Sequence, residues 1–145
     1  MLQVTLPLRF ATKTMHFIAV LTVVFDFTAI TSRITGINPR TDTLPQDLAF
    51  FNSHLQTLSA ISYAAIACFA VEYVSLFLGV SMFLNHVMAL NILAHSAGLI
   101  LTVLFYINGW TLSSYIAFFV VFNAAPMLLE VFTLFFLSRF SFMKY

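Results

Sequence analysis

Four long apolar runs divide this sequence, and they constrain its fold more than any other feature. They lie at about residues 15–30, 55–78, 87–107 and 112–137. A helix rises 1.5 Å per residue, so about 20 apolar residues cross a hydrocarbon core roughly 30 Å thick. Only 8% of the residues are charged, against about 25% in a soluble domain, which leaves too little polar surface for a water-exposed globule. The sequence predicts an all-α membrane protein with four transmembrane helices arranged as two hairpins.

The connections between these runs indicate one tetraspan membrane domain over residues 1–145. Residues 1–13 are predicted to form an amphipathic head, and residues 31–53 a hydrophilic loop punctuated by Gly36, Pro39 and Pro45. The first run resembles the core of a signal peptide. We interpret it as a retained helix because Asp26 interrupts it and residues 29–32 make a poor cleavage site.

The positions of Lys and Arg predict the orientation. With four spans, both termini share one side, which then holds Arg9, Lys13, Arg139 and Lys144, against Arg33 and Arg40 opposite. The positive-inside rule therefore predicts that both termini are cytosolic. No basic run supports nucleic-acid binding, and a single cysteine, Cys68, excludes an intrachain disulfide and a cysteine metal site.

Glu72 is the most informative polar residue, because it lies inside an apolar run. An unpaired carboxylate ionised in lipid costs several kcal/mol or more, so Glu72 needs a partner, a proton or a task. Each helix carries a thin polar stripe at helical spacing, and depth along the helices predicts one intramembrane polar layer of Glu72, His95 and Glu130. Six residues are expected to support that layer by hydrogen bonding or close packing: Asn91, Asn123, Ser75, Thr133, Gly79 and Pro126.

Two interpretations of this layer remain open. Intramembrane ionisable residues are functional candidates, so the layer could carry protons or ions or hold a lipid. Alternatively, the layer holds the helices together, with the glutamates protonated or bonded to His95 and hydroxyl groups. We favour this interpretation because no Lys, Arg or longer relay extends the layer. No catalytic residues are predicted, since no Gly-x-Ser-x-Gly motif occurs, and neither a metal nor another cofactor is expected, since no His-Glu-x-x-His motif occurs.

Several landmarks follow one another in the order of a known family. They are Ala70-Val71-Glu72, Gly79-Val80-Ser81-Met82-Phe83, Ala94-His95-Ser96, Trp110, Pro126 and Glu130. With these residues the chain resembles the transmembrane protein 107 family over about residues 55–137. The first helix and the long loop are similar to that family only in length and hydropathy.

The resemblance implies a non-catalytic scaffold in the membrane of the ciliary transition zone. Members of the family help assemble the Meckel-syndrome module, a barrier that controls ciliary membrane composition and ciliogenesis. The partners it implies are other transition-zone membrane proteins of that module, together with membrane lipid, and a homo- or hetero-oligomer is compatible with it.

Overall fold

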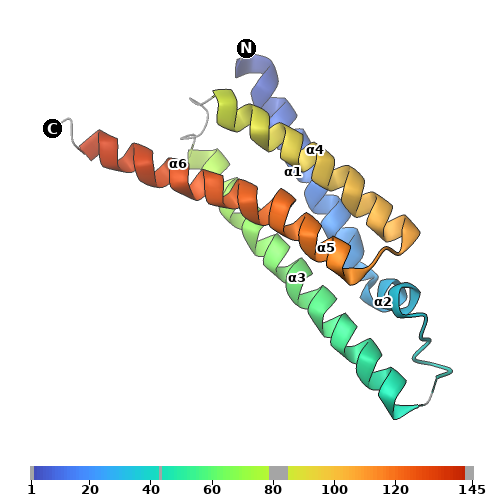
Figure 1. Ribbon diagram of the computed structural model, residues 1–145. Coiled ribbons are helices and arrows are strands. Elements are labelled where there is room, and N and C mark those ends of the chain that lie inside the picture. Colours follow the sequence, from blue (N-terminus) through green and yellow to red (C-terminus); the bar gives the residue numbers. More distant parts are fainter. Residues whose placement is uncertain (1, 43, 79–84, 143–145) are drawn as a thin grey trace.

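The computed structural model describes residues 2–42, 44–78 and 85–142 and is helical almost throughout (Figure 1). Its elements are α1 (Leu2–Phe25), α2 (Phe27–Thr35), α3 (Pro45–Leu78), α4 (Asn85–Asn108), α5 (Leu112–Phe119), the π-helix η2 (Val120–Ala124) and α6 (Ala125–Phe142). Four stretches are long and apolar enough to cross a membrane: Thr5–Phe25, Pro45–Leu78, Asn85–Asn108 and Leu112–Phe136. The predicted all-α, four-span fold is confirmed.

Helix α1 differs most from its prediction. The expected helix at about residues 15–30 instead begins at Leu2 and ends at Phe25, so the predicted amphipathic head belongs to the helix itself. Hydropathy suggested a later start because Arg9 and Lys13 are costly in lipid. Both side chains are fully buried in the bundle, which removes that objection.

The predicted hydrophilic loop at residues 31–53 is shorter than expected. Helix α2 covers its beginning, and α3 starts at Pro45, where proline suits a first helical turn. The connection starts at Gly36, whose positive φ of 71° ends α2 while its N–H donates to the Ser32 carbonyl. Helix α4 lies within two residues of its predicted range, and helix α6 continues to Phe142, beyond the apolar stretch that ends at Phe136.

The helices pack as one bundle in which α5 and α6 cross α3 (Figure 1). Helices α1 and α4 run parallel and side by side, and their packing is the most extensive in the molecule. Helix α3 lies against α1, and the fourth span crosses α3 and α4. The start of α1 and the end of α6 lie at the same end of the bundle, while α2 lies at the other.

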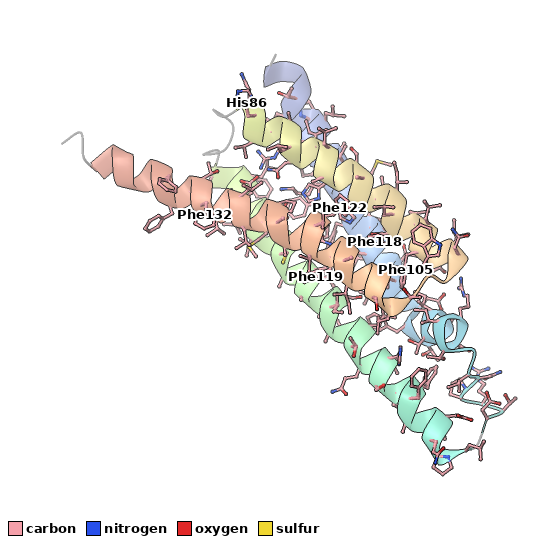
Figure 2. The ribbon with its side chains drawn as sticks, viewed as in Figure 1. His86, Phe105, Phe118, Phe119, Phe122 and Phe132 are labelled. Atoms are coloured by element: carbon pink, nitrogen blue, oxygen red, sulfur yellow. The ribbon has the colours of Figure 1, made fainter. Side chains whose placement is uncertain are left out.

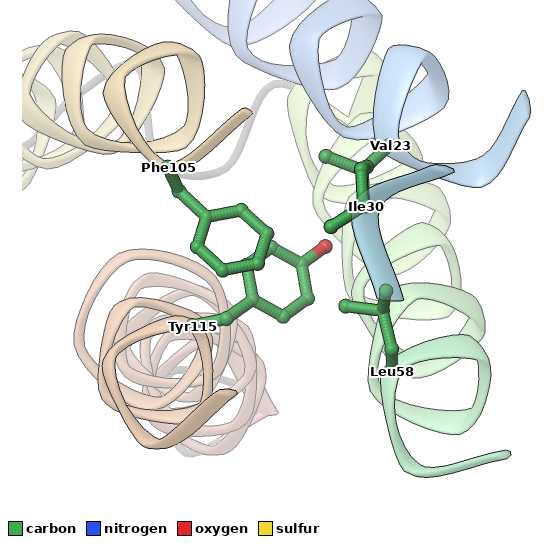
Figure 3. Packing of buried hydrophobic residues seen from close by; sticks show 5 residues of the cluster. All are labelled: Val23, Ile30, Leu58, Phe105 and Tyr115. Atoms are coloured by element: carbon green, nitrogen blue, oxygen red, sulfur yellow. The ribbon is translucent and has the colours of Figure 1, made fainter. Parts of the chain in front are cut away.

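Aromatic side chains of α4, α5 and η2, including Phe105, Phe118 and Phe119, gather in the middle of the bundle (Figure 2). Toward the α2 end, an apolar cluster joins five helices, α1 to α5, with one residue from each (Figure 3): Val23, Ile30, Leu58, Phe105 and Tyr115. Phe105 stacks on Tyr115 with ring centroids 4.6 Å apart, and the Tyr115 hydroxyl hydrogen-bonds to Ser62 at 2.9 Å. This half of the interior is closed by apolar packing.

Candidate functional site

The other half of the interior contains a set of buried polar residues that we call the polar ladder. It has three layers, each about one helical turn from the next. The layers are Arg9, Ser75, Asn91 and Glu130; then Lys13, Glu72 and His95; then His16 and Thr102. All nine side chains are buried.

In the first layer, groups from three helices hold the Glu130 carboxylate. The Arg9 guanidinium donates to Oε1 and forms an ion pair with it. Asn91 Nδ2 donates to the same oxygen at 2.5 Å, and Ser75 Oγ donates to Oε2 at 2.5 Å. Hydrogen bonds from charged or polar donors to a carboxylate are among the strongest that side chains make.

In the second layer, Glu72 Oε2 lies 2.8 Å from Lys13 Nζ and 2.7 Å from His95 Nε2. Lys13 is one turn after Arg9 on α1, and His95 is one turn after Asn91 on α4. Each glutamate therefore has its own cation from α1 and its own polar partner from α4.

The third layer continues from His95. Its Nδ1 lies 3.2 Å from His16 Nδ1, and His16 Nε2 lies 3.5 Å from the Thr102 hydroxyl. Because an ionised carboxylate only accepts, His95 carries its proton on Nε2 and accepts on Nδ1. His16 then donates from Nδ1 and accepts on Nε2. One tautomer set is therefore compatible with all of these contacts.

The third layer depends on the absence of a side chain at Gly98. A Cβ built on Gly98 would lie 2.4 Å from His16 Cε1, so only glycine lets α4 approach α1 at this depth. The sequence places Gly98 one turn after His95, and the structure shows that its role is to accommodate the His16 ring.

The predicted site residues are only partly brought together. Glu72 and His95 are in direct contact, whereas Glu130 lies one layer away with Arg9, Ser75 and Asn91. The statement that no Lys or Arg extends the layer is wrong, because Arg9 and Lys13 are its cations. Their spacing with His16 and Val20, at i, i+4, i+7 and i+11 on one helix face, was the available signal.

Four other residues were expected to support the polar layer, and none of them is among the nine residues of the polar ladder: Asn123, Pro126, Thr133 and Gly79. Asn123 and Pro126 are buried around the π-turn η2, in which the Ala125 N–H donates to the Val120 carbonyl five residues earlier. The Thr133 hydroxyl donates to the Leu129 carbonyl of its own helix at 2.7 Å. Gly79 lies outside the described residues. Within the described ranges, no group of three His, Cys, Asp or Glu side chains is placed to hold a metal ion.

The fold and this site define a class of protein: a multi-pass helical membrane protein whose charged interior is paired within one chain. Residues 5–134 match the TMEM107 family, described as a transmembrane protein, so the chain belongs to the transmembrane protein 107 family. The match includes α1, which extends the resemblance found over residues 55–137. No curated protein and no solved structure matches the chain.

Proposed function

We propose that this protein is a non-catalytic membrane scaffold of the ciliary transition zone, which helps assemble the Meckel-syndrome module. The proposal rests on membership of the transmembrane protein 107 family, which is not a known enzyme family. In this role the chain would act beside other transition-zone membrane proteins and influence which membrane proteins enter the cilium.

The internal pairing of the charges supports a scaffold over a chemically active protein. Both glutamates are held by cations and donors of the same chain, and all of these groups are fully buried. A carboxylate paired in this way holds helices together. Exposed apolar side chains such as Ile18, Leu93 and Phe132 face outward from the same helices and suit contact with lipid or with partner helices.

The test is to tag the endogenous protein in ciliated cells and image it relative to the cilium base. We expect a ring or pair of spots at the transition zone. A charge-neutral variant, Lys13→Met with Glu72→Gln, should localise in the same way, because the ladder only holds the fold in this interpretation. A diffuse endoplasmic-reticulum pattern for the native protein would contradict the proposal.

A proton- or ion-conducting function is the second candidate, and the series Thr102–His16–His95–Glu72 is the observation that favours it. Beyond Thr102, however, the interior is filled by the apolar cluster of Val23, Ile30, Leu58, Phe105 and Tyr115 (Figure 3). We therefore expect proteoliposomes at high protein density to show no proton flux above empty vesicles. A flux that disappears in the charge-neutral variant would overturn the scaffold role.

A further inference from the structure

The outer surface of the α1/α4 pair has two hollows that the scaffold role does not use. The first, of about 280 Å³, lies at the start of both helices and is lined by Thr5, Asn85, His86, Met88, Ala89 and Ile92. The second, also about 280 Å³, is lined farther along by Met15, Ile18, Ala19, Thr22, Leu99 and Val103. Both hollows combine residues of α1 with residues of α4.

The two hollows lie along one seam. On α4 the first hollow is lined by residues 85, 86, 88, 89 and 92 and the second by residues 99 and 103, and on α1 they are lined by residue 5 and by residues 15, 18, 19 and 22. At 3.6 residues per turn, residues 85, 89, 92, 99 and 103 share one face of α4, and residues 15, 19 and 22 share one face of α1. Because α1 and α4 are parallel and adjacent, both hollows lie between these two helices, at two positions along the pair. We call this feature the outer seam groove.

The chemistry of the groove changes along its length. Its mouth carries the hydroxyl of Thr5, the amide of Asn85 and the imidazole of His86, which lies at the start of α4 (Figure 2). Farther along, Thr22 is the only polar residue in the lining of the second hollow. Ala19 and Ala89 have no atoms beyond Cβ, so they leave room between longer neighbours. One hollow with polar groups at its mouth, followed along the same helix pair by a second that is almost wholly apolar, fits an amphiphile.

We propose that the outer seam groove binds one phospholipid molecule. The Asn85 amide and the His86 ring N–H donate to its phosphate oxygens, since ionised phosphate is a strong acceptor. One acyl chain lies along Ala89, Ile92, Leu99 and Val103. This site is separate from the polar ladder, and its occupation does not depend on the cellular location of the protein.

Photo-crosslinking tests this site directly. The full-length protein is placed in phosphatidylcholine nanodiscs with a trace of phosphatidylcholine that carries a chain diazirine, and the labelled peptides are mapped by mass spectrometry. We expect labels to concentrate on residues 15–22 and 89–103. Ala89→Phe fills the groove and should lower that labelling about tenfold, equivalent to about 1.4 kcal/mol.

Ala60→Phe is the matched control, because Ala60 is exposed on α3 outside the groove. It should leave the labelling unchanged, and both variants must keep native helicity and elution volume. If Ala89→Phe disturbs folding, Thr22→Phe, at an exposed position in the second hollow, replaces it. Labelling spread evenly over outward residues such as Phe132 would mean ordinary surrounding lipid and would overturn the proposal, as would crosslinks to a second copy of the chain.

Competition tests the phosphate assignment. Unlabelled phosphatidylcholine in excess should suppress the groove labelling, and diacylglycerol with the same chains should not. His86→Ala and Asn85→Ala should remove this difference between the competitors. Equal competition by diacylglycerol against the native protein would overturn the phosphate contact.

Discussion

Two carboxylates and two cations lie fully buried in this bundle, and each pair draws its members from different helices. Such pairs cost much to desolvate, and removing one partner leaves an uncompensated buried charge. Replacing both partners together with uncharged side chains of similar size is often neutral. This asymmetry distinguishes a structural ion pair from a residue that is needed for its charge.

Glu72→Gln alone should destabilise the folded protein by about 3–5 kcal/mol, because Lys13, at 0% side-chain exposure, then has no carboxylate to pair with. Lys13→Met combined with Glu72→Gln should recover most of that loss. The free energy of unfolding is measured in mixed micelles by denaturant titration.

The control for this cycle is the surface pair of Arg33 and Asp26. Their nitrogen and oxygen lie 3.6 Å apart, and both side chains are more than a third exposed. Asp26→Asn should therefore change stability by at most about 1 kcal/mol. If the single Glu72 variant and the double variant were equally unstable, the pair would not act as an electrostatic unit.

At the scale of elements, the contact between α1 and α4 determines which groups of the ladder can meet. Gly98 lets the helices approach until His16 reaches both His95 and Thr102. On the opposite side of the ladder, the π-turn η2 lies between α5 and α6 and adds a wide turn before Pro126. Both features adjust helix position and rotation so that polar side chains turn inward.

Gly98→Ala should destabilise the protein by about 1–3 kcal/mol, because the added Cβ would clash with a buried ring. In a His16→Ala background the same change should cost much less, since the space beside Gly98 is then open. Thermal unfolding of the four proteins gives the coupling. Additive effects would mean that His16 does not determine the need for glycine.

At the scale of the whole molecule, α1 depends on the other helices for its place in the membrane. Arg and Lys near a helix centre each cost about 2.5–3.5 kcal/mol to insert, and Leu, Ile, Phe and Val each return about 0.3–0.6. Residues 5–25 hold ten such apolar residues against Arg9 and Lys13, so the terms nearly cancel. The free energy of inserting α1 alone is therefore close to zero. Ion pairs of Arg9 and Lys13 with Glu130 and Glu72 then stabilise the inserted helix.

The positions of Arg9 and Lys13 also change the basis for the orientation. Because both lie inside the bundle, they no longer count toward either side of the membrane. The predicted topology then leaves two basic residues on each side: Arg139 and Lys144 on one, Arg33 and Arg40 on the other. Cytosolic termini therefore stay a prediction.

A glycosylation reporter tests both the insertion of α1 and the orientation. The chain has no Asn-x-Ser/Thr acceptor, so a single acceptor engineered into residues 36–42 is unambiguous. We expect glycosylation in the full chain and a marked loss in a chain ended after residue 44, which lacks both glutamates. Equal modification of the two chains would show that α1 inserts by itself. Modification of an acceptor at the C-terminus would show that the orientation is the reverse of the predicted one.

Apolar length and residue order were enough to predict the class of protein, the number of spans and the family, because both are local properties of the chain. It also identified Glu72, His95 and Glu130 as residues that need partners. The contacts between helices, which are seen only in the tertiary structure, show that Arg9 and Lys13 are those partners and that the glutamates occupy separate layers. The reason is physical: hydropathy assigns each charge its cost in lipid, and that cost is offset only when an opposite charge from another helix lies within hydrogen-bonding distance.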